Sequence, residues 1–230
     1  MKHLVGSFNL SYIRQHVQNS IDTDPQTILK ALKVHPILKY HYEPLVDDHM
    51  TLEQHTIDTI KLFQQNFAGK EKKLFLSDQC FYVLLAFHAI GKRQAIIEGR
   101  NDFHRQYTIK IIDEVIDIIP FTPQIEKQMK LLIDSVENYV DVDFNLTLQN
   151  LVSNIKKQHH AFDKTTPLEK IWYTFLVYFQ CTMMEFQYLF DTNEKDGLFM
   201  YDEEKHRILF SKYIEHKLIK LEKELFKNQR

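Results

Sequence analysis

The stretch from Ser77 to Lys92 reads SDQCFYVLLAFHAIGK, and it is the most informative part of the chain for the fold. Its first two residues, Ser77 and Asp78, are favoured at helix N-caps. The run from Phe81 to Ile90 is apolar apart from one histidine, and Gly91 stands where a helix can be closed. A run that is apolar all round is typical of a helix buried on every side. The stretch therefore predicts a central buried helix.

Further helix-start signals recur on both sides of this stretch. Thr51 and Gln54 have the spacing of a capping box, which predicts a helix through Phe67. Asn101 and Asp102 are predicted to cap a helix that runs to about Ile119. Other helices are predicted after Thr23-Asp24-Pro25, after Thr122-Pro123, over 145–159, from Thr166-Pro167 through Phe190, and over 210–226. The segment 197–209 is predicted to be irregular or a short hairpin.

The composition agrees with a helical protein. Of 230 residues, 44% are hydrophobic, which is enough for a sizeable core, and only 5 Gly and 6 Pro are present, too few for the many turns of a β-sandwich. No Gly- or Ser-rich linker divides the chain. We expect an all-α bundle of about eight helices in a single domain over 1–230, with a core at about 51–184 and helical extensions at both ends.

The charge pattern disfavours several classes of partner. The formal net charge is −2 with interspersed signs, so we expect no extended nucleic acid as a partner, and the lysines after Lys217 indicate a solvated helix face. No signal peptide or membrane-spanning run is recognisable, so we expect a cytoplasmic protein without a membrane partner. Cys80 and Cys181 lie in apolar runs and are interpreted as buried free thiols.

Three of the twelve histidines stand out. His55 lies one turn into a predicted helix, His88 ends the central apolar run, and His104 follows the next predicted cap. Most of the others are interpreted as surface residues: His3, His16, His35, His41, His159, His160, His206 and His216. His49, beside two aspartates, is interpreted as part of a solvated loop, with a cleft as the alternative.

The order of these three histidines resembles the HD superfamily. Its members carry a helix-borne His, a His-Asp pair often written His-Asp-Ile-Gly-Lys, and a distal Asp, and the segment from Phe87 to Lys92 matches the central motif at all but one place. The resemblance covers about 51–184. It implies an all-helical pocket, a divalent metal (Mn, Zn, Mg, Fe or Ni) held by His55, His88 and His104, and hydrolysis of a phosphoester. Lys92 and Arg93 would bind the phosphate; the alternative, weighed equally, is that their charge complements the dipole at a helix C-terminus.

The sequence departs from the family at both acids. The Asp of the His-Asp pair is Ala89, and the distal position falls at Gln180 or Thr182. Asp134 is the remaining candidate for a carboxylate that assists the metal, with a surface role as the alternative. Loss of acidic ligands would weaken metal binding. The losses have two explanations: natural degeneration, which we favour, or an engineered Asp-to-Ala change at position 89.

Several functions therefore stay open. The first is an HD-type phosphohydrolase acting on or binding a nucleotide or phosphodiester, with impaired or altered catalysis. The second is a non-catalytic pseudoenzyme that binds a phosphorylated small molecule, a nucleotide or a protein partner. The third is an inactive engineered form of an active enzyme. A purely structural helical protein remains as a further alternative. The aromatic residues from Trp172 to Tyr188 are interpreted mainly as core.

Overall fold

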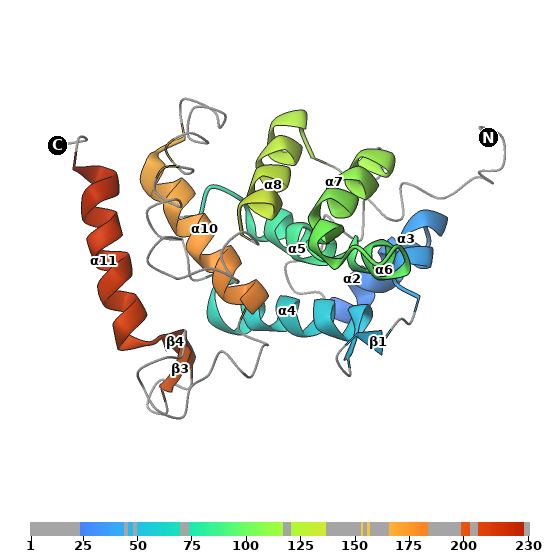
Figure 1. The fold of residues 1–230 in the computed structure, drawn as a ribbon, viewed down its shortest axis with the longest axis horizontal. Coiled ribbons are helices and arrows are strands. Elements are labelled where there is room, and N and C mark those ends of the chain that lie inside the picture. The colour runs from blue at the N-terminus through green and yellow to red at the C-terminus, as the bar shows by residue number, and fades with distance from the viewer. Residues whose placement is uncertain are drawn as a thin grey trace. The chain divides into compact units, whose positions relative to one another are not determined.

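The computed structural model describes residues 24–43, 46–47, 50–69, 74–116, 121–136, 153, 156, 166–183, 199–202 and 207–227. Helices dominate these residues, as expected for the all-α class (Figure 1). The helices and strands are, in chain order, α2 (Pro25–Leu32), α3 (Pro36–His41), β1 (Val46–Asp47), β2 (Met50–Thr51), α4 (Leu52–Asn66), α5 (Asp78–Phe87), α6 (Lys92–Ile97), the 3₁₀ turn η2 (Asn101–Phe103), α7 (His104–Glu114), α8 (Pro123–Val136), α10 (Leu168–Met183), β3 (Phe199–Asp202), β4 (Arg207–Phe210) and α11 (Lys212–Phe226).

The chain divides into two compact units. One unit comprises Met1–Gly69 and Leu76–Asp134, and the other comprises Lys70–Phe75 and Ser135–Arg230. The three candidate histidines all belong to the first unit, whereas the helix expected to carry the distal acid belongs to the second. A single domain over 1–230 remains a prediction.

The first unit is built around α5, the helix predicted from the central apolar run. Ser77 caps it by accepting a hydrogen bond from the backbone N–H of Cys80, and every residue from Cys80 to Ile90 is buried. The Phe63 ring of α4 stacks on Phe81 at a centroid distance of 4.4 Å, and the Tyr42 hydroxyl donates to the carbonyl of Ala86. α4 packs against α5 and α2. The apolar composition of α5 thus follows from its burial by neighbouring helices.

Two glycines shape the chain after α5. The sequence suggested that Gly91 closes the central helix as a left-handed cap. The helix instead ends at Phe87, and Gly91 has an ordinary φ of −76°. Its role is close packing: a Cβ there would lie 2.1 Å from the carbonyl oxygen of His104. Gly99, with φ of 65°, provides the left-handed residue that ends α6. Gly91 therefore lets α7 approach the turn that follows His88.

Other predicted boundaries hold in part. Thr51 accepts from the N–H of Gln54, but the Gln54 side chain donates to Asp58, so only half of the capping box forms. The predicted Asn101-Asp102 cap was wrong, because residues 101–103 form a 3₁₀ turn and α7 begins at His104. α7 also ends at Glu114 instead of Ile119, and the turn at Val115 is closed by its N–H, which bonds to the carbonyls of Ile111 and Ile112.

The second unit contains α10, α11 and the hairpin β3–β4. The hairpin, predicted as one alternative for 197–209, pairs Phe199 with Phe210 and Met200 with Leu209 in antiparallel register. Phe179 of α10 lies 6.4 Å from Phe199 between ring centroids, and the Trp172 indole donates to Glu222 of α11 at 2.8 Å. The described aromatic residues of α10 are mainly core, as predicted. The helix predicted over 145–159 lies outside the described residues, except that 153 and 156 are helical.

One stretch of the described chain has the length and composition of a membrane-spanning segment. Asp78–Ile97 is long and apolar enough, by length and composition, to cross a membrane, but 72% of that window is buried within the protein. It comprises α5, a turn and α6 instead of one continuous helix. Its apolar character is explained by the core of the first unit. Cys80 and Cys181 are buried free thiols, as expected, and burial raises the pKa of both.

Candidate functional site

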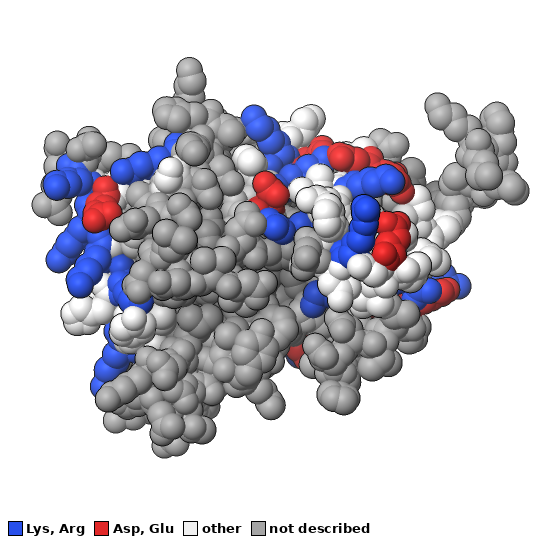
Figure 2. All heavy atoms as spheres, in the orientation of Figure 1, with Lys and Arg blue, Asp and Glu red and all other residues white. Residues whose placement is uncertain are grey.

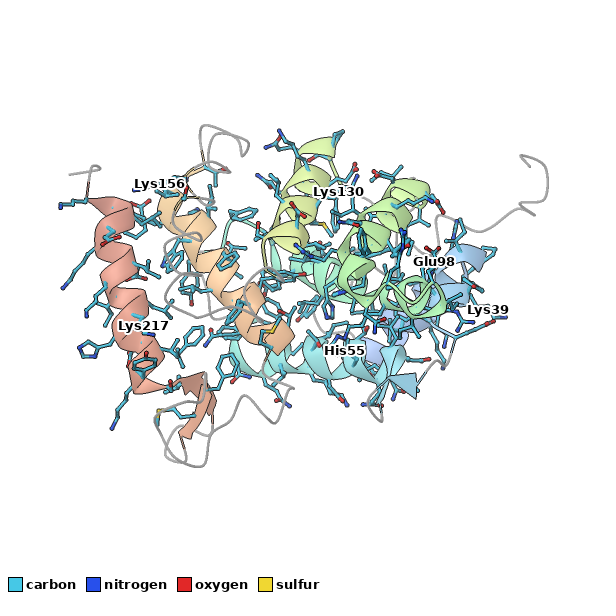
Figure 3. The ribbon with its side chains drawn as sticks, viewed as in Figure 1. Lys39, His55, Glu98, Lys130, Lys156 and Lys217 are labelled. Carbon is cyan, nitrogen blue, oxygen red and sulfur yellow. The ribbon has the colours of Figure 1, made fainter. Side chains whose placement is uncertain are left out.

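His55 and His88 are brought together by α4 and α5. His55 is the fourth residue of α4, whose start is capped by Thr51, and it is 7% exposed (Figure 3). His88 directly follows the last residue of α5 and is 5% exposed. The Nε2 atoms of the two rings lie 2.8 Å apart, and the ring centroids are separated by 4.8 Å with an interplanar angle of 38°. The two imidazoles are therefore joined by a buried hydrogen bond.

The backbone of α5 fixes the protonation of this pair. The Nδ1 of His88 lies 2.6 Å from the carbonyl oxygen of Leu85, and a carbonyl can only accept, so Nδ1 carries a proton. In a neutral ring the other nitrogen then has the lone pair. His88 Nε2 consequently accepts, and His55 Nε2 donates. This assignment is consistent as long as both rings are neutral.

Both rings are held neutral by their surroundings. Burial lowers the pKa of His88 to about 3, with further lowering by the charges of Lys92 and His104, and this outweighs the opposing effect of the Leu85 hydrogen bond. Burial also lowers the pKa of His55 well below its ordinary value, helped by Lys92, His88 and His104. At neutral pH the pair is an uncharged donor–acceptor unit beside the positive charge of Lys92.

The remaining predicted site residues, the ligand candidate His104 and the cations Lys92 and Arg93, are placed differently from one another. His104 starts α7, is half-buried, and its Nδ1 lies 2.9 Å from the carbonyl oxygen of Asn101. Lys92, also half-buried, starts α6, and its charge acts on both buried histidines. Arg93 instead donates to the backbone carbonyl of Glu43 at 2.9 Å and lies 4.6 Å from the centre of the Tyr40 ring. Lys92 and His104 thus belong to the surroundings of the pair, while Arg93 is engaged with α3 and the residues after it.

Acidic groups are the missing part of the predicted centre. Ala89, at the position of the family Asp, is 2% exposed and has no ligating atom in its side chain. The Asp134 side chain is 60% exposed and lies 3.8 Å from Arg105, whose guanidinium also donates to the Asp134 carbonyl. In α10, the Thr182 hydroxyl donates to the Tyr178 carbonyl of its own helix.

These donors do not fit the complete metal centre of an HD enzyme. Among the described residues, no group of three His, Cys, Asp or Glu side chains is placed to hold a metal ion. The two buried imidazoles direct Nε2 at each other, whereas ligands of one tetrahedral metal at about 2.0–2.1 Å would be separated by about 3.3 Å. To bind a metal, His55 would have to move its proton to Nδ1, and the rings would have to separate slightly.

A third buried histidine was missed from the sequence. His41, predicted to lie on the surface, is 7% exposed, so that prediction was wrong. Burial lowers its pKa to about 4, and Arg93 contributes to the shift. The signal was its spacing: His41 follows the buried Leu38 by three residues and so lies on the same face of α3. His35 is half-buried, whereas His216 is exposed as predicted. His3, His16, His49, His159, His160 and His206 lie outside the described residues.

No protein family, curated protein or solved structure matches this chain.

Proposed function

We propose that this chain is a degenerate HD-like protein that binds a phosphorylated small molecule, such as a nucleotide, and hydrolyses it poorly or not at all. The proposal depends on one observation. Two of the three histidines that the resemblance assigns to the metal centre are in direct contact: His55 of α4 and His88, which follows α5. The residue after His88 is alanine. The spacing of the motif is retained without the carboxylate that the chemistry needs.

The electrostatics support a phosphorylated ligand. Lys92 places positive charge near a pair of neutral imidazoles, and its charge acts on both rings. A phosphoryl group is recognised by such cations and by N–H donors. Loss of the acid at position 89 also removes a negative charge that would repel phosphate in the absence of a metal. A site of this kind favours binding over turnover.

Poor hydrolysis follows from the same arrangement. Activation of water at neutral pH by an HD-type centre depends on a metal held by imidazole and carboxylate ligands. Here the described carboxylate candidate, Asp134, is exposed and lies beside Arg105. The two neutral imidazoles also satisfy each other by hydrogen bonding, so metal binding must compete with that contact. We expect weak metal affinity.

Residual phosphohydrolase activity is the second candidate, and one observation favours it. His88 donates from Nδ1 to the Leu85 carbonyl, which leaves Nε2 as the nitrogen with the lone pair. A histidine that binds a metal almost always donates its other ring N–H to a carboxylate, a backbone carbonyl or water. Under this alternative, His55, His88 and His104 would hold the ion, Asp134 would assist, and Lys92 would bind phosphate.

A thermal-shift titration distinguishes the candidates. ATP, GTP and inorganic phosphate would each be added with EDTA or with Mn²⁺, and phosphate release would be measured in parallel. We expect ATP or GTP to raise the Tm in EDTA, an effect that Lys92→Gln removes and Lys61→Gln keeps; Lys61 is an exposed lysine of α4. Absence of any shift would contradict the proposed binding. Mn²⁺-dependent phosphate release that His88→Ala abolishes would establish the second candidate instead.

A further inference from the structure

α11 has one face committed to the interior of the second unit. Its buried residues, Ile214, Leu218, Leu221 and Leu225, repeat at spacings of three and four, which places them on one stripe. Glu222, next to this stripe, accepts the hydrogen bond of the Trp172 indole. The rotation of α11 about its own axis is thereby fixed, and so is the set of residues that it presents to solvent.

The solvent face of α11 is basic. Successive helix residues are separated by about 100°, so Lys212, His216, Lys220, Lys223 and Lys227 fall within an arc of about 80° opposite the buried stripe. All five are exposed. The glutamates of the helix, Glu215, Glu222 and Glu224, fall outside this arc. These five residues, called the basic face below, form an acid-free row about 22 Å long. Figure 2 shows Lys side chains gathered along α11, with acidic side chains beside them.

Two exposed apolar side chains flank the basic face. Ile219 is 44% exposed on one side, and Tyr213 is 49% exposed on the other. The amino group of Lys217 lies 3.9 Å from the centre of the Tyr213 ring. Each edge of the basic face therefore carries an exposed apolar side chain, and Tyr213 also has a polar hydroxyl suited to the boundary between water and an apolar phase.

From this arrangement we propose that the basic face of α11 binds a membrane surface that carries anionic lipid head groups. A straight row of lysines matches a flat, negatively charged surface, and basic helix faces are attracted to such leaflets. Ile219 and Tyr213 would enter the head-group layer beside the lysines. The apolar stripe of α11 would stay in the protein, so contact is peripheral. The sequence suggested an ordinary solvated face because Lys and Glu alternate along the chain; only the helix geometry separates them.

Lipid is favoured over nucleic acid by the side chains that are present. The basic face carries no Arg, Asn or Gln, so lysine is its only side chain with a common role in reading base edges. Against a phosphate backbone, Ile219 and Tyr213 would remain in water, whereas a bilayer gives both a favourable position. The inference does not depend on the proposed nucleotide site, which lies in the other unit.

Vesicle co-sedimentation tests the inference. The full chain would be mixed with phosphatidylcholine vesicles containing about 30% phosphatidylserine, or none, at about 50 and about 300 mM salt. We expect partitioning only with phosphatidylserine, weakened at high salt. The variant K212Q/K220Q/K223Q/K227Q should lower the partition coefficient about a hundredfold or more, because each lysine contributes about fivefold.

The matched control is K30Q/K39Q/K61Q/K110Q, which removes the same charge from exposed lysines of the first unit. It should bind within about twofold of the wild type, and circular dichroism would verify that both variants are folded. No partitioning at low salt, or equal loss in both variants, would overturn the inference. So would binding to duplex DNA or single-stranded RNA as tight as binding to the vesicles.

Discussion

The backbone N–H of Gly91 donates to the hydroxyl of Thr108 across 2.9 Å, so α7 rests directly on the turn that follows His88. This contact sets the position of the His104 end of α7 relative to His88. It requires a residue without a side chain, because a Cβ at Gly91 would lie 2.1 Å from the His104 carbonyl and 2.4 Å from the Thr108 nitrogen. Both of these neighbours are backbone atoms, which cannot rotate away.

We therefore expect Gly91→Ala to destabilise the protein strongly. Relief of the overlap needs a shift of α7, at a cost of about 2–4 kcal/mol in the free energy of unfolding. Gly99→Ala is the matched control: its φ of 65° makes alanine unfavourable, but no atom lies within 4 Å of the added Cβ, so about 1 kcal/mol is expected. Urea denaturation measures both. Equal losses would show that close packing at Gly91 is unimportant.

The His55–His88 contact can be measured with a double-mutant cycle. Either His55→Leu or His88→Leu leaves a buried ring nitrogen without its imidazole partner, at a cost of about 1–3 kcal/mol. The double variant should lose about 1 kcal/mol less than the sum of the single losses, because it removes both polar groups. A cycle between His88→Leu and His216→Leu should be additive, since His216 is an exposed residue of α11. Additivity in both cycles would disprove the hydrogen bond.

Restoring the acid next to His88 should restore metal binding. We expect Ala89→Asp to raise Mn²⁺ or Zn²⁺ affinity at least about tenfold, since carboxylate joins imidazole as a ligand. Ala89→Asn, which has the same shape without the charge, should have little effect. Because Ala89 is 2% exposed, the Asp variant should also lose stability in EDTA and regain it with metal. Competition with a fluorescent chelator gives the affinities; equal values for Asp and Asn would mean that the motif is misplaced.

Stability should fall in mild acid, and His41 should contribute to the fall alongside the buried His55 and His88. The pKa of His41 is lowered from an ordinary value near 6.5 to about 4 by burial and by Arg93. Between these values the unfolded chain binds more protons, so the contribution of His41 is full above about pH 6.5 and is lost as the pH falls towards 4. His41→Gln should reduce the slope of unfolding free energy against pH in this window, by less than about 1 kcal/mol per unit. His216→Gln should leave the slope unchanged. Identical slopes for His41→Gln and the wild type would show that His41 is not buried in solution.

The helices were predictable where the signal was local. Ser77, Thr51 and the Thr122-Pro123 pair mark helix starts that the structure contains, because caps and first-turn prolines act within one turn. Predictions failed where a distant contact decides the outcome. Gly91 was interpreted as a helix cap, but its neighbours are residues of α7, which sequence position does not reveal. His41 was predicted to lie on the surface, but packing around α3 buries it.

For the candidate site, the sequence determined which donors exist: imidazoles at 55, 88 and 104, cations at 92 and 93, and alanine at 89. That inventory is fixed by residue identity alone. The tertiary structure decided which of them interact, because Nε2 of His55 meets Nε2 of His88 only when α4 packs on α5. It also placed Arg93 against Glu43 and Asp134 beside Arg105. Local patterns specify helices through contacts within a few residues, whereas the distance between two helices depends on every side chain packed between them.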